Sequence, residues 1–476
     1  MTVVTRIARE EWRFLFRDRV AVFGLSLLAV LMLVAAFNAW EHQRNANAER
    51  ARYQAQANHE FEAQPDRHPH RVAHYGHFLF RPLNPLAAFD PGIDAYTGNT
   101  LFLEAHRQNS ANFGDVRQSS LLLRFGQLTP AFVLQVLAPL LLVFVGHAGV
   151  ARERESGTLR VLLAQGVSGR QLVLGKLLAL AGFAGLILLP ALSALGWMAI
   201  IGQSGWALAL MLSAGYIVWL LLWTLAVVLV SSVFARSRDA LLALLVVWAV
   251  MVILLPRWIP DVANTAIALP TRFENEIHAK REYLALGDAH NPDDPKFAEF
   301  RDQVLKEYGV TRIEDLPVNF KGLVGMEGER QSSELFNRYA TATLDLQDRQ
   351  NRMVDGFGWL SPTLALRRLS MTASGTDLDS FRRFLEQGER YRYDLIQRLN
   401  RLQAEELAYA DDTNPDKENR IDHTHWQSFP PFQLEPRTTT ETWQRIMPAG
   451  GILLLWLIVL AAATRLRAGR LGRTVR

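Results

Sequence analysis

The chain has 476 residues, no cysteine and a formal net charge of only +4. The absence of cysteine excludes disulfides, thiolate catalysis and cysteine-ligated zinc or iron–sulfur sites. The small net charge indicates no polyanion-binding surface, so we expect no nucleic-acid partner. Apolar residues make up 49% of the chain, but they gather in long uncharged runs between strongly polar stretches. This pattern is typical of a membrane protein with large aqueous domains.

Six apolar runs are candidate membrane spans, because about 20 mainly apolar residues cross a bilayer. In chain order they are residues 20–39, 129–151, two spans within 177–235, then 240–256 and 447–464. The stretch 177–235 carries no Asp, Glu, Lys or Arg and is too long for one span. Its Gly-Gln-Ser-Gly sequence at 202–205 predicts a tight turn between two spans. The first run lacks a small-residue cleavage signal, so we expect a retained helix.

Basic residues in the short flanking segments predict the orientation of the spans. They cluster before the first span, after the second, after the fourth and after the sixth. The residues are Arg6, Arg9, Arg13, Arg17, Arg19, Arg152, Arg154, Arg160, Arg170, Lys176, Arg236, Arg238, Arg465, Arg467, Arg470, Arg473 and Arg476. With six spans, all four segments and both termini fall on one side, which we expect to be the cytoplasm. Trp40, Trp258 and Trp443 then lie at the opposite membrane boundary, where indole rings are favoured.

The polar regions between the spans have different expected structures. Residues 5–19 are amphipathic at helical spacing and predict a helix on the inner leaflet or, alternatively, a cap packed on protein. Residues 40–60 should extend the first helix out of the membrane, before a segment of turns and extended chain rich in Pro and Gly. Residues 327–354 and 377–409 have helical patterns and predict a long antiparallel hairpin.

We therefore predict an all-α membrane protein, a six-helix transmembrane bundle with an amphipathic N-terminal interfacial helix and two large, mainly helical extracytoplasmic insertions. The expected units are 1–39 (interfacial helix and first span), 40–128 (first outer domain), 129–256 (spans two to five), 257–446 (second outer domain) and 447–476 (sixth span and basic tail).

The loop after the second span carries the most informative motif. Acidic and basic residues stand where the chain leaves the second span, a Ser-Gly turn follows, and an amphipathic segment with a leucine face comes next. Such a helix at the cytoplasmic end of a bundle can dock into a soluble partner and transmit its movement. The alternative is a loop whose charges only fix the topology. The residues singled out within 152–170 are Glu153, Glu155, Gly157, Thr158, Leu159, Leu162, Ser168 and Arg170.

This loop resembles that of the type-2 ABC exporter permeases. The family pattern reads acid-x-acid-x-Gly-Thr-Leu, then two leucines, a small-Arg pair and Gly-Lys, and Leu163, Gly175 and Lys176 also stand in those places. The order of helix, span, outer region, span and loop agrees over residues 1–256. The two long insertions resemble a subgroup whose outer domain has no known function. That likeness includes residues 74–76, 90–92, 103–106 and 361–377.

The resemblance implies a multi-pass permease of the bacterial inner membrane with cytoplasmic N- and C-termini. It implies two copies of a separate ATPase subunit and a second permease subunit, either identical or a paralogue, in contact with membrane lipid. Segment 152–170 would be the coupling helix. ATP and Mg²⁺ would bind the partner, and this chain would be a non-catalytic subunit without a cofactor of its own.

Two absences in the sequence agree with a separate motor. Residues 169–176 echo a Walker A motif, but their glycine spacing is one residue too long and Leu177 replaces the Ser/Thr. The spans hold almost no ionisable groups, whereas ion-coupled carriers usually place such groups inside the bilayer. An apolar path favours a hydrophobic or amphipathic substrate.

A histidine group in the first outer domain leaves one alternative open. His68, His70, His74 and His77 have a spacing at which imidazoles bind zinc or copper. Without cysteine or clustered methionine we expect turn and surface roles instead, with His74 and His77 as the weak metal candidates. The alternative functions are therefore a metal-delivery permease for metalloenzyme maturation, or a membrane scaffold that binds a periplasmic partner and moves nothing.

Overall fold

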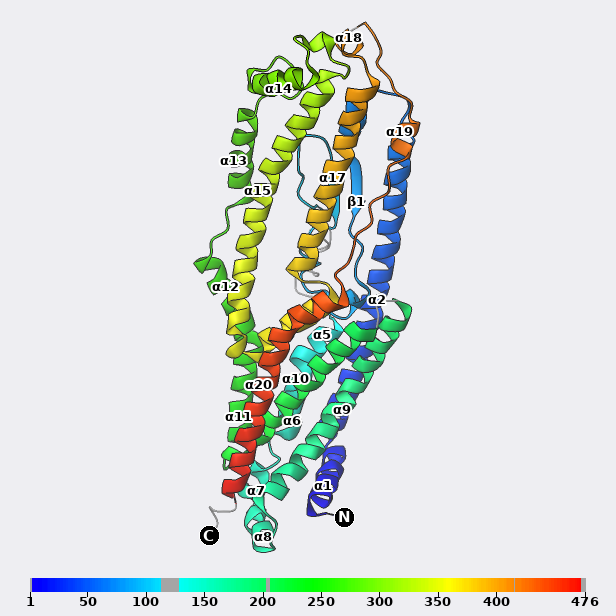
Figure 1. Ribbon diagram of the computed structural model, residues 1–476. Coiled ribbons are helices and arrows are strands. Elements are labelled where there is room, and N and C mark those ends of the chain that lie inside the picture. The colour runs from blue at the N-terminus through cyan, green and yellow to red at the C-terminus, as the bar shows by residue number, and fades with distance from the viewer. Residues whose placement is uncertain (1, 113–127, 203–205, 415, 472–476) are drawn as a thin grey trace.

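The computed structural model describes residues 2–112, 128–202, 206–414 and 416–471, and this part of the chain is almost entirely helical. The all-α class is therefore confirmed. Figure 1 shows a tall molecule with a helical bundle at one end and a second group of helices at the other. We call the second group the head domain, which comprises the described residues of 40–112 and 267–438.

The bundle is built from long apolar helices, two of which contain a π-helical segment. Its elements are α1 (Val3–Arg17), α2 (Arg19–Glu62), α5 (Pro130–Phe132), the π-helix η3 (Val133–Leu137), α6 (Ala138–Gly146), α7 (Ala151–Glu155), α8 (Thr158–Ala164), α9 (Gly169–Ile201), α10 (Trp206–Val233), α11 (Ser237–Trp248), the π-helix η4 (Ala249–Leu254), α12 (Leu255–Ala266) and α20 (Thr439–Leu471).

The head domain contains shorter helices, two long ones and one small antiparallel sheet. Its elements are α3 (Pro69–Tyr75), β1 (His77–Phe80), η1 (Pro85–Ala88), β2 (Thr100–Leu103), α13 (Arg272–Ala285), η5 (Pro295–Phe297), α14 (Ala298–Tyr308), η6 (Ile313–Asp315), α15 (Phe320–Gly356), η7 (Phe357–Trp359), α16 (Pro362–Ser374), α17 (Leu378–Glu406), α18 (Tyr409–Asp412) and α19 (Thr424–Gln427).

Six helical stretches of the described chain are long and apolar enough to cross a membrane. Each covers all or nearly all of one predicted span. They are Arg19–Glu62, Pro130–Glu155, Gly169–Ile201, Trp206–Val233, Ser237–Ala266 and Thr439–Leu471. Large apolar side chains are exposed along them, including Phe23, Leu210 and Ile458. Large exposed apolar surfaces on helices of bilayer length indicate that lipid covers these faces.

Several helices extend beyond the predicted spans. The first reaches Glu62, the fifth reaches Ala266 and the sixth begins at Thr439. The fifth continues past Pro256 and Pro260, and the sixth passes through Pro448. The continuation of the first helix through residues 40–60 is confirmed. The predicted turn between spans three and four follows Gly202, but residues 203–205 lie outside the described residues, as do Arg473 and Arg476 of the basic tail.

Amide side chains on the upper part of α2 explain why that stretch is polar yet remains helical. The Gln54 amide accepts a hydrogen bond from the Phe80 N–H (2.9 Å) and donates to the Phe78 carbonyl (3.1 Å). Asn47 pairs in the same way with the N–H and C=O of Leu83. These residues lie on one helical face. Gln54 hydrogen-bonds the outer edge of β1, and Asn47 hydrogen-bonds the chain that follows β1.

Helix α1 packs against the lower part of α9 rather than lying free. The Ile7 side chain lies where a Cβ on Gly175 would clash, 2.6 Å from Cγ2, and Trp12 lies similarly against Gly182. Leu15 is buried, whereas Phe14 is exposed. The structure therefore favours the cap packed on protein. Exposed apolar side chains such as Phe14 remain on the rest of the surface of α1.

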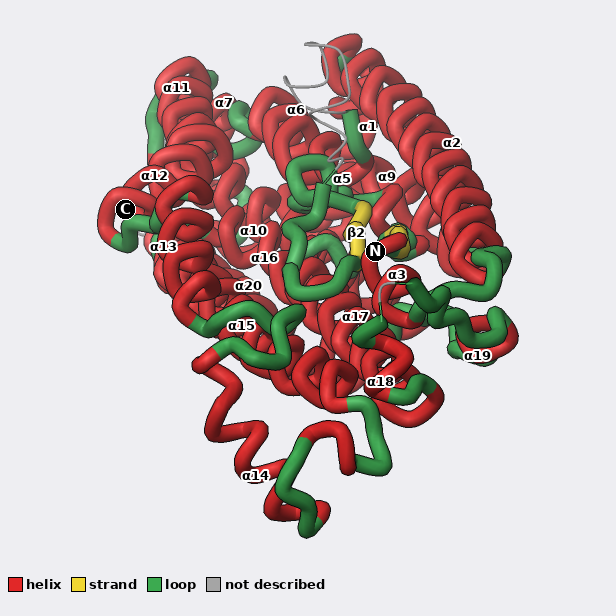
Figure 2. Tube along the Cα trace, turned by 90° about the horizontal axis from the view of Figure 1, so that it is seen from above, coloured by secondary structure: helices red, strands yellow, loops and turns green. Residues whose placement is uncertain are grey.

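The long helices α15 and α17 form the predicted antiparallel hairpin of the head domain (Figure 1). The link between them contains a third helix, α16, which was not predicted and which packs against α10 and α20 of the bundle. On α16, Ser370 shares a 2.8 Å hydrogen bond with the buried Tyr216 of α10. Seen from above, α3 and β2 lie on the side of α17 that faces α2 (Figure 2).

The segment between α16 and α17 joins the two parts of the head domain, residues 40–112 and 267–438. The Thr376 hydroxyl donates to the Asp90 carbonyl (2.9 Å), and the Ile93 N–H donates to the Thr376 carbonyl (3.0 Å). Asp377 caps α17 and pairs with Arg437 at 2.8 Å, with both side chains almost fully buried. Two segments that resemble the permease subgroup, 90–92 and 361–377, therefore meet at this junction.

The Asp377–Arg437 pair should make the junction sensitive to acid. Burial alone would raise the pKa of Asp377, but Arg437, with smaller contributions from Ser380 and Arg368, outweighs burial and lowers the pKa from 3.8 to about 2. A depressed folded-state pKa gives stability that is present above pH 3.8 and lost as the pH falls through about 2. We expect Asp377→Asn to remove roughly 2 kcal/mol of this pH-dependent stability, so its thermal midpoint should fall less than that of the unmodified protein between pH 5 and pH 2.5. Equal slopes in both proteins would contradict this assignment.

Candidate functional site

The predicted coupling segment forms two short helices at the end of the bundle opposite the head domain. We call α7 and α8 with the turn between them the hook, residues 151–164. Figure 1 shows the hook at the same end as both chain termini. Its tip is exposed from Glu155 through Thr158, and Arg160 and Val161 on α8 are exposed as well. The start of the hook, by contrast, is bonded to several bundle helices. We call α7, together with the bundle residues that bond it, the base of the hook.

Gly157 sets the sharp turn at the tip of the hook. Its φ is +76°, in the left-handed region, and no atom would lie within 4 Å of an added Cβ. The requirement for glycine is therefore one of backbone conformation rather than space, because an L-residue with a side chain costs about 1–2 kcal/mol there. Ser156 and Thr158 flank it and share a 2.8 Å hydrogen bond between their hydroxyls.

Arg154 ties the base of the hook to the end of α10. Its guanidinium donates to the carbonyls of Ser232 (2.8 Å), Val233 (2.9 Å) and Phe234 (3.1 Å). Arg467 of α20 donates to the same Ser232 carbonyl. Carbonyls at a helix C-terminus have no partner within the helix and carry partial negative charge, so two guanidinium groups are favourable there.

Glu155 connects the hook to the start of α11. One of its carboxylate oxygens accepts from the backbone N–H (3.1 Å) and the hydroxyl (2.9 Å) of Ser237. An acidic group at a helix N-terminus complements the helix dipole. The buried Ser231 hydroxyl accepts from the N–H groups of Val150 and Ala151 at the start of α7. The hook is thus hydrogen-bonded to the end of α10 and to the start of α11.

Lys176 completes the base by joining three helices through charge. Its Nζ lies 2.5 Å from Glu11 of α1 and 3.0 Å from Glu153 of α7. The lysine is buried on α9, and the two carboxylates are mostly buried. Arg152 adds a weaker contact to Glu11 at 3.6 Å. A triad of this kind resists separation of its members, because an unpaired buried charge is strongly destabilising.

The remaining predicted residues have simple structural positions. Ser168 caps α9 and forms a capping box with Gln171. Leu159 is buried against the bundle and Leu162 is half-buried, whereas Arg170 is exposed. Residues 169–176, the echo of a Walker A motif, form the first two turns of α9 instead of a loop. The N–H groups from Gln171 onward are bonded to the Ser168 cap or within the helix, so the segment does not form the phosphate-binding loop of a Walker A motif.

Several residues of the base were not recognised from the sequence. They are Glu11, Arg154, Ser231, Ser237 and Arg467. Arg154 and Arg467 were assigned only as topology signals. Glu11 lies 165 positions from Lys176, and no local pattern marks such a pair. The one feature of the sequence that could have marked Glu11 is its place near the apolar face of an amphipathic helix.

The two weak metal candidates from the sequence are separated in the structure. His77 begins β1 and is buried against Phe61, with ring centroids 5.2 Å apart, and burial lowers its pKa to about 4. His68 bonds Asp412 at 2.8 Å. His74 instead lies with His70 and with two histidines that sequence spacing did not connect to them, His106 and His290.

One comparison with known proteins bears on the head domain. Residues 258–435 match the model of a family described as a domain of unknown function (DUF3526). The match covers α13 to α19 and less than half of the chain. No curated protein matches the chain. The matched family describes no activity, so the function has to be argued from the geometry of the chain.

Proposed function

We propose that the chain is the membrane-spanning subunit of an ABC exporter whose ATPase is a separate protein. The observation that carries the proposal is the hook, with its exposed tip and its base bonded to α1, α9, α10 and α11. An exposed element with no fixed base would yield locally when pushed. A bonded base passes a displacement of the tip on to the bundle helices.

The mechanism follows from where the hook is bonded. Closure of the ATPase on ATP would push α8, whose exposed Arg160 and Val161 offer the contact surface. Arg154 and Glu155 would carry the push to the turn between α10 and α11, and Lys176 would carry it to α1 and α9. Because packed helices shift as rigid bodies, the bundle would exchange between two arrangements rather than deform.

The proposal includes the partners expected from the family resemblance. Two ATPase subunits would bind ATP and Mg²⁺, and a second permease subunit would complete the path through a bacterial inner membrane. The hook and both termini would face the cytoplasm, and the head domain would face the periplasm. The apolar spans favour a hydrophobic or amphipathic substrate.

The absence of native cysteine allows a direct test of sidedness and contact. Val161→Cys on the hook and Leu284→Cys on α13 introduce single thiols at exposed positions. We expect a membrane-impermeant maleimide to label Leu284→Cys in intact spheroplasts and Val161→Cys only in inverted vesicles. We also expect Val161→Cys to crosslink to a co-purified ATPase subunit. Labelling of both thiols from the same side would refute the proposal.

Substitutions at the hook should break the communication without unfolding the bundle. Gly157→Leu forces a side chain into a left-handed turn, and Glu155→Ala releases the start of α11. We expect both variants to bind the ATPase but to lose most of the change in Leu284→Cys labelling rate that ATP produces. Arg9→Met, an exposed change on α1, is the control. An ATP response unchanged in both variants would contradict a coupling role for the hook, whereas no ATP response in the unmodified chain would favour the scaffold alternative.

A further inference from the structure

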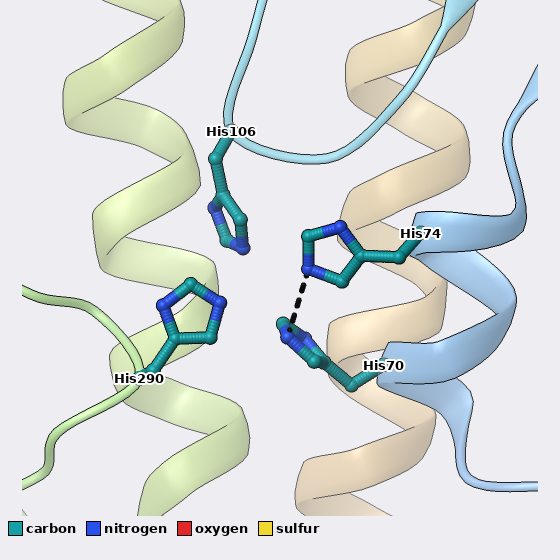
Figure 3. Close-up of side chains that lie close together, drawn as sticks. All are labelled: His70, His74, His106 and His290. Atoms are coloured by element: carbon teal, nitrogen blue, oxygen red, sulfur yellow. Dashed lines mark hydrogen bonds between the residues drawn. The ribbon is translucent and has the colours of Figure 1, made fainter.

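Four histidines from three separate segments meet in the head domain. His70 and His74 lie one turn apart on α3, His106 follows β2, and His290 lies in the loop after α13. One ligand nitrogen from each ring lies within 4.8 Å of all the others. Figure 3 shows the four rings gathered around a common space. We call these four residues the imidazole cluster.

The spacing of the cluster is close to that of a tetrahedral metal site. Zn–N bonds of about 2.0–2.1 Å place tetrahedral ligand nitrogens about 3.3 Å apart. The Nε2 atoms of His70 and His74 are 3.0 Å apart. The widest separation needs only modest side-chain rotation to close, and the rings of His74 and His290 are exposed. Their exposure also leaves a path for an ion to enter.

The rings are electrically suited to be ligands. Burial, followed by the neighbouring imidazoles, lowers the pKa of His70 to about 3. Burial also lowers the pKa of His106 to about 4 despite the nearby Glu329. Neutral imidazole is the form that binds metal. The Nε2 of His106, in a side chain 8% exposed, has no hydrogen-bond partner, although buried polar atoms normally have one.

Carboxylates stand behind two of the rings on the side away from the common space. Glu329 Oε2 lies 3.4 Å from His106 Nδ1 and accepts the His106 backbone N–H at 2.9 Å. Asp288 lies 2.9 Å from His290 Nδ1. A carboxylate on one ring nitrogen fixes the tautomer and turns the other nitrogen toward a metal. The backbone of His106 has a φ of +61°, a conformation that is uncommon for a residue with a side chain.

The surrounding charge also favours a cation. Glu329 and Glu389 face the single guanidinium of Arg392, which leaves one negative charge unbalanced beside His106. A dication at the cluster would compensate this charge. The bound ion would also connect the two parts of the head domain, because residues 40–112 carry three of the histidines and residues 267–438 carry His290.

We propose that His70, His74, His106 and His290 bind one divalent transition-metal ion of the zinc or copper class and crosslink the two polar regions. Four imidazoles and no carboxylate ligand disfavour Mg²⁺ and Ca²⁺, which require oxygen ligands. Asp288 and Glu329 are positioning residues that act through His290 and His106. This inference does not depend on the transport proposal.

The test measures metal binding to the full chain, purified in detergent with a tag that contains no histidine. After chelation, the protein is dialysed separately against ZnCl₂, CuCl₂ and MgCl₂, and bound metal is measured by mass spectrometry. We expect one Zn²⁺ or Cu²⁺ per chain and no retained Mg²⁺. Preference for one of the two identifies the ion. Failure to retain either ion would overturn the proposal.

Matched variants locate the site. His74→Ala/His290→Ala changes two exposed rings, and we expect it to lose stoichiometric binding. His278→Ala, an exposed histidine on α13 outside the cluster, should bind as the unmodified chain does. Asp288→Asn should weaken binding about tenfold or more, as loss of a carboxylate behind a ligand does. Full binding in the double variant, with its thermal midpoint unchanged, would show that the ion lies elsewhere.

Discussion

Replacing Arg392 by methionine is expected to lower the free energy of unfolding of the head domain by about 3–5 kcal/mol. The guanidinium lies between α15 and α17 with 1% of its side chain exposed, and all five of its N–H groups have an acceptor. Glu329 and Glu389 supply most of them. Burial of Arg392 would lower its pKa, but the hydrogen bonds and the negative charges of these two acids outweigh burial and raise the pKa above its usual range. Methionine would leave both carboxylates buried and facing each other.

The measurement is a urea titration of the detergent-purified chain followed by pulse proteolysis, because cleavage of α15 and α17 reports opening of the head domain. Arg401→Met, an exposed change on the same helix, is the matched control and should alter the midpoint little. A triple change of Glu329, Glu389 and Arg392 to apolar residues should recover much of the loss. A midpoint for Arg392→Met equal to that of the control would show that the pairing is dispensable.

The parts of the fold that the sequence predicted are those with a local signal. The apolar runs have the length of a bilayer, and the amphipathic pattern of residues 5–19 predicted α1. The hook was recognised because Gly157 and the acids before it lie within a few residues of one another. Helix ends were less predictable, since α12 continues through Pro260 and α20 through Pro448.

The parts that could not be predicted depend on contacts between distant segments. The sequence grouped His77 with His74 because they are three positions apart, but a short helix followed directly by a strand turns His77 into the core. His290, 216 positions after His74, completes the group instead. Likewise no local pattern predicted that α16 packs against α10 and α20, although Pro362 and Gly375 stand at the two ends of this helix.

At the base of the hook, too, the residues with a local pattern were predicted and their distant partners were not. The acids and Lys176 were visible as a motif, but their partners were not. Once Glu11 is known, the motif acquires a physical reason, since the lysine in the Gly-Lys pair balances one acid of the hook and one of the N-terminal helix. The small residue before it, Gly175, allows α1 to approach closely enough for that contact.

Replacing Lys176 by methionine is therefore expected to uncouple the hook from the bundle. Glu11 and Glu153 would be left close together without their shared cation, and their repulsion would separate α1 from α7. Spin labels on Val161→Cys and Leu284→Cys report the distance between hook and head domain. We expect ATP to change this distance in the unmodified complex with its ATPase, and the change to be lost in Lys176→Met while ATP hydrolysis continues. Arg9→Met should behave as the unmodified protein. An ATP-driven change that persists in Lys176→Met would mean that the push travels only through Arg154 and Glu155.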